Sequence, residues 1–244
     1  MKHWTEAYKI GDRLKLGRSI LTVGVDESPS PPLCFGLPDS PDFRGFEVDL
    51  LRVIASKLGV TLRCNSALWS VAFGKLQSSR LDMICTAVTI TPQRRQLVDF
   101  SEPYFETDLA LIVRRDSPIQ YVQDLSGRTV GVRIATVAEE FVRGHCQAGA
   151  VRTFDLNVDT YQALCNRQVD AVIDDRPIGK FFSHSVEGLS VAPPLAGTGF
   201  QYGMVFAKGN DPLRRAVNRA LADLRADGTW QRLYHRWFDE GSGQ

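Results

Sequence analysis

The sequence lacks the features that mark several specialised classes of protein. Its 244 residues include 29 Lys and Arg against 28 Asp and Glu, which gives a formal net charge of +1. This balance excludes the strong basic excess of a typical nucleic-acid-binding domain, so we expect no nucleic-acid partner. No run of about 18 apolar residues occurs, so the sequence predicts no membrane-spanning helix.

Cysteine is also scarce. The five cysteines are too few and too scattered for a disulfide scaffold, and an odd number leaves at least one thiol unpaired in a monomer. This favours a reducing compartment, although small buried cysteines are also ordinary core residues. No CxxC, HExxH or His/Cys cluster is present, so we expect no metal site and no cofactor. The first residues, Met1–Lys9, contain no apolar segment, which predicts a cytosolic chain or one whose secretory signal has been removed.

The first hundred residues alternate apolar runs with segments of helical period. Strands are predicted at Ile20–Val25, Val60–Arg63 and Met83–Cys85, and helices over Leu50–Leu58 and Val71–Leu76. Gly59 follows the first helix as a C-cap. This order predicts an α/β fold whose strands are largely parallel.

The same pattern then recurs later in the chain. Thr22–Val25 is echoed by Thr129–Val132, and Leu76–Ile84 by Leu164–Val172, with the same spacing from Leu to Asp. Chance similarity between α/β units is the alternative, but two matches in the same order favour two similar lobes.

The last segment predicts how the lobes are connected. Tyr202–Ala207 reads as a strand, Asp211-Pro212 starts a helix that runs to Gly228, and Trp230–Phe238 forms a shorter helix with packed aromatic residues. No linker rich in Pro or Gly separates the halves. We expect short crossings and a cleft with limited hinge motion. The predicted lobe 1 comprises residues 18–107 and 200–240, and lobe 2 comprises residues 108–199.

Arg94 is the first candidate for ligand binding. Thr91 and Pro92 suit the N-cap and first position of a helix that follows the strand ending at Cys85. A cation in the first turn of a helix opposes the helix dipole, which makes sense if an anion shares the site. Ligands in open α/β sheets bind beyond the carboxyl ends of strands. We therefore expect Arg94 to bind a carboxylate and Arg95 to lie at the surface.

Lobe 2 offers a second anion feature and a possible cation site. Thr136–Glu139 forms a capping box after the strand that ends at Arg133. Asp174 and Asp175 follow another strand, where adjacent carboxylates need a cation such as Arg176 or a ligand ammonium. Because side chains alternate along a strand, we expect one of the two to face the cleft. A carboxylate site and an ammonium site together describe an α-amino acid.

At this point the chain resembles the amino-acid-type periplasmic solute-binding proteins of ABC importers, solute-binding protein family 3. The matching stretches, which run from about Ile10 to Phe238, are Gly45–Leu50, Thr89–Arg94, Val98–Tyr104, Asp124–Gly127, Val169–Val172 and Ala226–Thr229. The resemblance implies a two-lobed fold that closes on one amino acid, a permease partner, a monomer and a periplasmic location.

The resemblance also implies roles for individual residues. Arg94 and Thr136 match positions that hold the α-carboxylate, with Thr86 and Thr89 nearby. Asp175 matches the position that meets the α-amino group. Trp69 matches a position that lines the side-chain pocket, although core packing is as good an interpretation from the residues alone. Arg133 matches a position that touches the ligand side chain in some glutamine-type members.

The chain departs from the family pattern at the loop after the first strand. Family members usually carry an aromatic residue there, whereas this loop reads Asp26–Leu33 without one. Ala135 replaces the more usual glycine before Thr136. The absent aromatic lid and Arg133 favour a polar or acidic ligand side chain, whereas Asp26 and Glu27 would favour a basic one, and we expect a polar one.

Three functions are compatible with these residues. The first is capture of a free L-amino acid by hinge closure and its delivery to a membrane permease. The second is a cyclohexadienyl or arogenate dehydratase-like lyase on the same fold, but Ile178 stands where those enzymes carry a catalytic Glu. No other acid–base pair or nucleophile is evident, and the four histidines, His3, His145, His184 and His235, are expected at the surface. The third is a sensor module, which would need a membrane or kinase segment.

Overall fold

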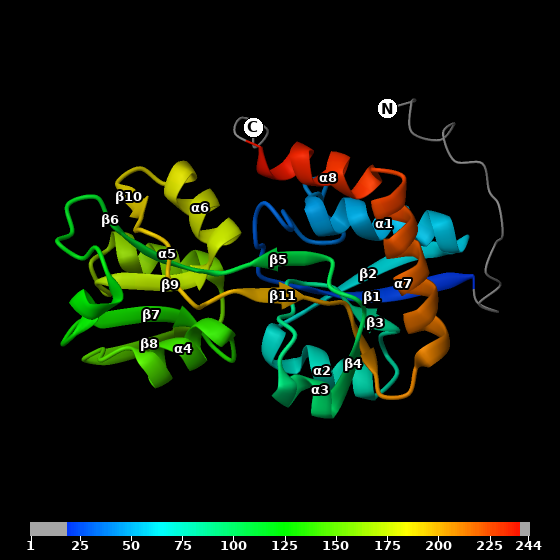
Figure 1. The fold of residues 1–244 in the computed structure, drawn as a ribbon, viewed down its shortest axis with the longest axis horizontal. Coiled ribbons are helices and arrows are strands. Elements are labelled where there is room, and N and C mark those ends of the chain that lie inside the picture. The colour runs from blue at the N-terminus through cyan, green and yellow to red at the C-terminus, as the bar shows by residue number, and fades with distance from the viewer. Residues whose placement is uncertain (1–18, 240–244) are drawn as a thin grey trace.

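Two lobes make up the protein. The computed structural model describes residues 19–239, apart from the side chains of Trp69 and Ser70. Each lobe is built on one five-stranded sheet, and a two-stranded pair, β5 (Phe105–Thr107) with β11 (Phe200–Tyr202), runs between them. Figure 1 shows the lobes side by side with these two strands at the crossing. The predicted two-lobed α/β architecture is therefore confirmed.

Lobe 1 is a sheet covered by helices on both faces. Its strand order is β2 (Thr61–Ala67), β1 (Ile20–Asp26), β3 (Met83–Ile84), β12 (Val205–Ala207) and β4 (Val98–Phe100). One face is covered by α1 (Phe46–Leu58), α7 (Asp211–Ala226) and α8 (Thr229–Phe238), and the other by α2 (Trp69–Gln77) and α3 (Pro92–Leu97).

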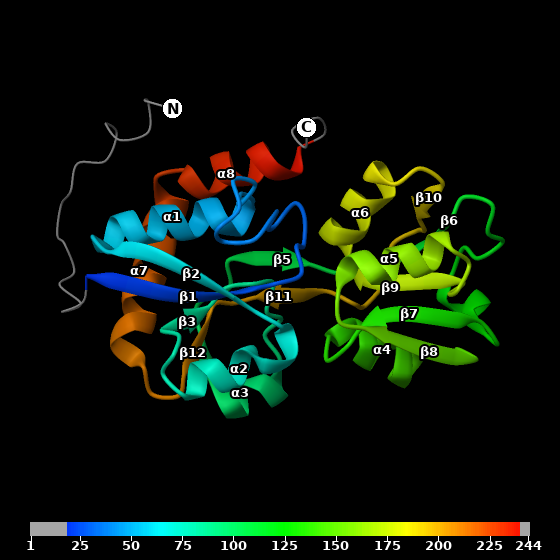
Figure 2. The same cartoon turned by 180° about the vertical axis from the view of Figure 1, so that it is seen from behind.

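Lobe 2 repeats this arrangement. Its strand order is β10 (Leu189–Val191), β6 (Leu109–Arg114), β9 (Ala171–Asp175), β7 (Thr129–Arg133) and β8 (Ala150–Phe154). Both views place α5 (Asn157–Cys165) and α6 (Arg176–Ser185) over one face and α4 (Val137–His145) over the other, as Figure 2 shows from behind. A short 3₁₀ turn, η1 (Val122–Leu125), precedes β7.

The strands are less uniformly parallel than the sequence predicted. The β1–β2, β1–β3, β7–β8 and β7–β9 pairs are parallel, as expected for β-α-β units. In contrast, β12 runs antiparallel to both of its neighbours, and β6 runs antiparallel to β9 and β10. These strands lie beside the crossings, where the chain enters a sheet from the opposite lobe rather than through a helix of the same lobe.

The internal repeat seen in the sequence has the same geometry in both lobes. Asp82 accepts a hydrogen bond from the Thr22 N–H at 2.8 Å, and its own N–H donates to the Thr22 carbonyl at 2.8 Å. Asp170 does the same with Thr129, at 2.8 and 2.7 Å. The turn before each Asp holds a residue with positive φ, 57° at Ser79 and 59° at Arg167. The sequence echo therefore reflects a repeated structural unit.

The predicted strand over Tyr202–Ala207 is two strands that belong to different sheets. β11 ends at Tyr202, and β12 begins at Val205. Between them, a Cβ on Gly203 would lie 2.9 Å from side-chain carbons of Ile90 and Phe100, so a larger residue here would require these side chains to shift. The predicted lobe boundaries at 107/108 and 199/200 lie beside β5 and β11, and the division itself stays a prediction.

Aromatic residues of α8 pack against α1. Trp237 is 8% exposed, and its Nε1–H donates to the Asp49 carboxylate of α1 at 3.0 Å. The Phe238 ring packs 5.3 Å from the Phe46 ring. These contacts confirm that the predicted aromatic helix contributes to the core. Across residues 19–239, every helix is too short or too polar to cross a membrane.

Candidate functional site

A cleft between the two lobes is the candidate site. It contains about 460 Å³ of space free of protein atoms, part of it continuous with solvent. Both lobes contribute walls, which are formed by Asp26, Ser30, Thr86, Ala87, Thr89, Arg94, Arg133, Thr136, Val137, Asp174, Asp175 and Ile178. A ligand in this space would contact both lobes at once.

Six of the seven predicted ligand-binding residues line this cleft. Arg94, Thr86 and Thr89 come from lobe 1, and Thr136, Arg133 and Asp175 come from lobe 2. The seventh, Trp69, begins α2, but its side chain lies outside the described residues. The structure therefore brings the six together from distant parts of the sequence.

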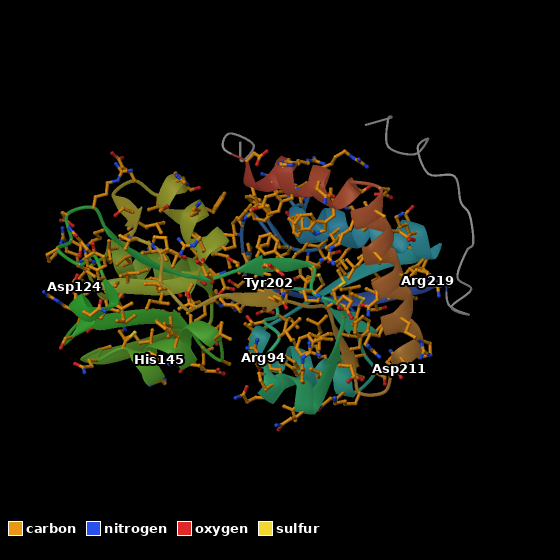
Figure 3. The ribbon with its side chains drawn as sticks, in the orientation of Figure 1. Arg94, Asp124, His145, Tyr202, Asp211 and Arg219 are labelled. Carbon is orange, nitrogen blue, oxygen red and sulfur yellow. The ribbon has the colours of Figure 1, made fainter. Side chains whose placement is uncertain are left out.

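Arg94 is held at the cleft by the start of α3. Its backbone N–H donates to the Thr91 hydroxyl at 3.1 Å, which makes Thr91 the predicted N-cap. Its guanidinium donates to the Thr89 carbonyl at 3.0 Å and, across the lobes, to the Ala135 carbonyl at 3.2 Å. Burial lowers the pKa of Arg94. Figure 3 shows Arg94 on the part of lobe 1 that faces lobe 2, whereas Arg95 is exposed, as predicted.

Asp174 and Asp175 end β9, and both line the cleft. The sequence predicted that one would face it, but alternation fails here because Asp175 already serves as the N-cap of α6. The Tyr202 hydroxyl donates to Asp175, and the Tyr161 hydroxyl donates to Asp174 at 2.8 Å. Burial raises the pKa of both carboxyl groups, and the charge of Asp174 raises that of Asp175 further. An ammonium in the cleft would stabilise both carboxylates.

Arg176 was considered as the cationic partner of these two acids, and the structure assigns it elsewhere. Its guanidinium forms a two-pronged pair with Asp108, with one contact at 3.0 Å. Arg176 lies in the first turn of α6, after the end of β9. Its side chain therefore reaches Asp108, in the segment between β5 and β6. Arg94, Arg133 and a bound ligand are therefore the cations that can stabilise the charges of Asp174 and Asp175.

Asp26 and Arg133 form an ion pair across the lobes that the sequence did not predict. Asp26 Oδ2 lies 2.6 Å from Arg133 Nη1, and the two side chains are 6% and 10% exposed. Arg133 Nη2 also donates to the Asp155 carbonyl at 2.9 Å, while its Nε–H is buried without a partner. The pair supplies one positive and one negative charge to the cleft wall.

A second contact between the lobes uses the loop that lacks the expected aromatic lid. The Asn157 backbone N–H donates to the Ser28 hydroxyl at 2.9 Å, and its side-chain amide donates to Ser30 Oγ at 2.9 Å and to the Pro29 carbonyl at 3.2 Å. Asn157 is completely buried. Sequence analysis missed this contact, although two serines in a proline-rich loop after a strand were a visible signal.

Thr136 caps α4, as its sequence context predicted. Its hydroxyl accepts from the Glu139 N–H at 3.3 Å and donates to the Arg133 carbonyl at 2.8 Å. The Glu139 carboxylate reaches back to the N–H of Ala135 at 2.7 Å. Ala135 has a φ of 58°, which is the conformation that the family's more usual glycine adopts without strain. The cap therefore places the start of α4, with Thr136 and Val137, at the cleft.

The remaining sequence predictions concern the histidines, Ile178 and metal binding. His145, His184 and His235 are exposed, as predicted, and His3 lies outside the described residues. Ile178 lines the cleft and is 4% exposed. Within residues 19–239 no cluster of three or more His, Cys, Asp or Glu side chains is arranged to hold a metal ion.

Comparison with known proteins identifies relatives along nearly the whole chain. Residues 21–240 match the family described as bacterial extracellular solute-binding proteins, family 3. The chain is 33% identical over 223 residues to the L-cystine-binding protein TcyJ of Escherichia coli K12, covering 91% of this chain and 83% of that protein.

Two solved structures illustrate the range of similar folds. An ancestral arginine-binding protein bound to glutamine is 32% identical with a TM-score of 0.85, covering 91% of this chain and 99% of that one. An ancestral amino acid-binding protein described as a precursor of cyclohexadienyl dehydratase is 28% identical with a TM-score of 0.84, covering 91% and 97%.

Proposed function

This chain belongs to the bacterial extracellular solute-binding proteins of family 3, and we propose that it binds a free L-amino acid between its lobes and delivers it to an ABC transporter permease. The observation that carries the proposal is the charge arrangement of one cleft. Arg94 of lobe 1 and the carboxylates of Asp174 and Asp175 in lobe 2 line the same space. The two charges of a zwitterion need such partners when they leave water.

The α-carboxylate is assigned to the Arg94 side of the cleft. A guanidinium binds a carboxylate through two parallel hydrogen bonds, and the hydroxyls of Thr89 and Thr136 lie in the same wall. The α-ammonium is assigned to Asp175, whose raised pKa reflects a buried acid that a nearby cation would stabilise. Because these groups come from both lobes, the ligand favours the closed arrangement.

The Asp26–Arg133 pair favours a ligand whose side chain is polar and carries no net charge. A basic side chain would place a second cation beside Arg133, and an acidic one would place a second anion beside Asp26. L-Glutamine and L-cystine both meet the condition, since the far end of cystine carries one charge of each sign. One relative is an L-cystine-binding protein, and one similar structure holds glutamine.

We propose that the chain has no catalytic activity of its own. The dehydratase alternative needs an acid at the position of Ile178, which is an apolar residue in the cleft wall. The family description favours action outside the cytoplasm, and we propose a periplasmic monomer.

A thermal-shift screen of the twenty amino acids and L-cystine tests the proposal. A ligand that binds only the native state adds about 2.7 kcal/mol of stability at a hundredfold excess over its Kd. Uncharged polar amino acids should raise the Tm, while lysine, arginine, aspartate and glutamate should have smaller effects. A Tm that none of the compounds changes would contradict the proposal, and formation of an aromatic product from prephenate or arogenate would favour the enzyme.

A further inference from the structure

The segment between β1 and α1 contacts lobe 2 through hydrogen bonds that involve no ligand. The Asn157 backbone N–H donates to the Ser28 hydroxyl at 2.9 Å, and the Asn157 side-chain amide donates to Ser30 Oγ at 2.9 Å. The same amide donates to the Pro29 carbonyl at 3.2 Å. Asn157 does not belong to the described residues that line the cleft, so these bonds join the lobes beside the ligand space.

The bond to Ser28 supplies a partner that α5 cannot provide for itself. Asn157 is the first residue of α5, and the preceding Leu156 forms no side-chain cap. The N–H groups in the first turn of a helix have no acceptor within that helix. The Ser28 hydroxyl, from the opposite lobe, therefore satisfies an N–H that would bond only to water if the lobes separated.

The Asn157 side chain adds two bonds at some cost. Its Nδ2 carries two hydrogens, and Ser30 and Pro29 accept one each. The residue is completely buried, although asparagine is mostly exposed in folded proteins. Its Oδ1 is buried with no hydrogen-bond partner among the described residues, which costs free energy in the closed arrangement. The contact is therefore favourable but limited in strength, so it can break when the lobes separate.

The segment that carries the serines is fixed to lobe 1. Leu33 is completely buried, and its carbonyl accepts a hydrogen bond from the Glu47 N–H of α1 at 3.0 Å. The Phe46 N–H donates to the Pro32 carbonyl at 3.1 Å. Because the segment is held against α1 at these points, its bonds to Asn157 join one lobe to the other.

An aromatic contact strengthens the same connection. The Phe35 ring lies 5.3 Å from the Phe181 ring in an edge-to-face arrangement and 5.8 Å from the Trp237 ring. Phe181 belongs to α6 of lobe 2, and Trp237 belongs to α8 of lobe 1. Edge-to-face aromatic pairs are favourable beyond the area that they bury. The segment therefore contacts lobe 2 at two helices, α5 and α6.

We propose that Asn157 and the Ser28–Ser30 segment form a latch that holds the two lobes together in the ligand-free protein. The consequence for the ligand rests on the proposed function: the lobes must separate before a ligand enters or leaves. The latch makes the same bonds with and without a ligand, so it slows both entry and release. A residue that contacts the ligand would instead change mainly the rate of release.

Amide hydrogen exchange of the ligand-free protein tests the latch directly. Because the Asn157 N–H has no acceptor within its helix, its protection reports the bond to Ser28. In the wild type it should exchange at least about tenfold slower than an unprotected amide, and in Ser28→Ala at least about fivefold faster than in the wild type. An unprotected Asn157 amide in the wild type, or equal exchange in Ser28→Ala, would overturn the proposal.

Thr160→Val is the matched control. It removes a buried hydroxyl of α5 that donates to the Leu156 carbonyl at 3.0 Å, a bond within lobe 2. The Asn157 amide should exchange within about twofold of the wild-type rate in this variant. A change as large as in Ser28→Ala would mean that the amide reports the stability of α5 rather than closure, and would refute the latch.

Stopped-flow binding of L-glutamine and of L-cystine tests the consequence for the ligand. For whichever compound binds the wild type, Asn157→Ala should raise the association and dissociation rate constants each at least about threefold, while Thr160→Val stays within about twofold. Faster dissociation with unchanged association, or two unchanged rates, would refute the latch. If Asn157→Ala does not fold, Ser28→Ala serves in its place. If neither compound binds the wild type, the proposed ligands are wrong, and the exchange measurement still decides the latch.

Discussion

Replacing Arg133 by methionine should change which amino acids the cleft accepts. The substitution removes the guanidinium 2.6 Å from Asp26 and leaves the carboxylate, which is 6% exposed, facing the cleft without its partner. Methionine fills a similar volume without a charge. A ligand with a cationic side chain would then supply the missing partner.

The expected size of the effect follows from the burial of the pair. Removing one member of a buried ion pair costs about 2–5 kcal/mol, much of it from the charge left unpaired. A ligand cation that recovers even about 1.4 kcal/mol of this gains tenfold in affinity. The ratio of the Kd for L-glutamine to the Kd for L-arginine should therefore rise at least about tenfold in Arg133→Met.

Titration calorimetry with L-glutamine, L-arginine and L-glutamate measures the change. Arg133→Lys keeps the cation and should preserve the wild-type order of ligands, while Asp26→Asn should move the preference toward L-glutamate. The double variant Asp26→Asn with Arg133→Met should show neither the shift toward L-arginine nor the shift toward L-glutamate. If Arg133→Met still binds L-glutamine but binds L-arginine no better than the wild type, the pair does not control ligand charge.

Four further outcomes follow from the structure. Arg94→Ala should weaken amino-acid binding by about 3 kcal/mol, roughly a hundredfold by calorimetry, because it removes two charge-assisted hydrogen bonds; unchanged affinity would disprove the assignment of the α-carboxylate. Binding should release protons and weaken as the pH falls through the raised pKa of Asp175, because a ligand ammonium stabilises its carboxylate; calorimetry in two buffers of different ionisation enthalpy detects the release. Burial raises the pKa of Glu47 from 4.5 to about 7, so between these pH values the native state binds a proton that the unfolded state has released. The native state should therefore lose about 3 kcal/mol of stability as the pH rises from 4.5 to 7. Urea unfolding should show a smaller loss in Glu47→Gln, and an equal dependence of stability on pH in both proteins would contradict the burial argument. Trp237→Phe should cost about 1–3 kcal/mol through the lost bond to Asp49, with ligand affinity unchanged; a large loss of affinity would mean that α8 affects the cleft.

Features governed by neighbours in sequence were predictable. The Thr91 and Thr136 caps and the Gly59 C-cap follow from local side-chain and backbone preferences. The repeated Leu-to-Asp spacing corresponds to the same pair of hydrogen bonds in each lobe, at Asp82 and Asp170. The groups that form the caps lie within a short stretch, whereas the bonds of Asp82 and Asp170 reach residues 60 and 41 positions away, and the repeated spacing indicated them only through the similarity of the two lobes.

Features that depend on how the lobes meet were not predictable. Asp26 and Arg133 are 107 residues apart, and only the packing of the lobes makes them partners. From the sequence, Asp26 suggested a contact for a ligand with a basic side chain. Its ion pair with Arg133 disfavours such a ligand. The contact of Asn157 with the Ser28–Ser30 loop has the same origin. Arg176 was paired with its neighbours in sequence because nothing local indicated Asp108.

The position of β12 has a consequence for the order in which the protein assembles. β12 lies between β3 and β4, although it is the last strand of the sheet to be synthesised. At about 5–20 residues per second, the ribosome reaches Val205 on the order of 5–20 seconds after Phe100. Until then β4 lacks its neighbour, whereas lobe 2 is one continuous stretch that can form its sheet during this interval. Lobe 2 can therefore fold first during translation, and the chain that follows it then supplies β12 to complete the sheet of lobe 1.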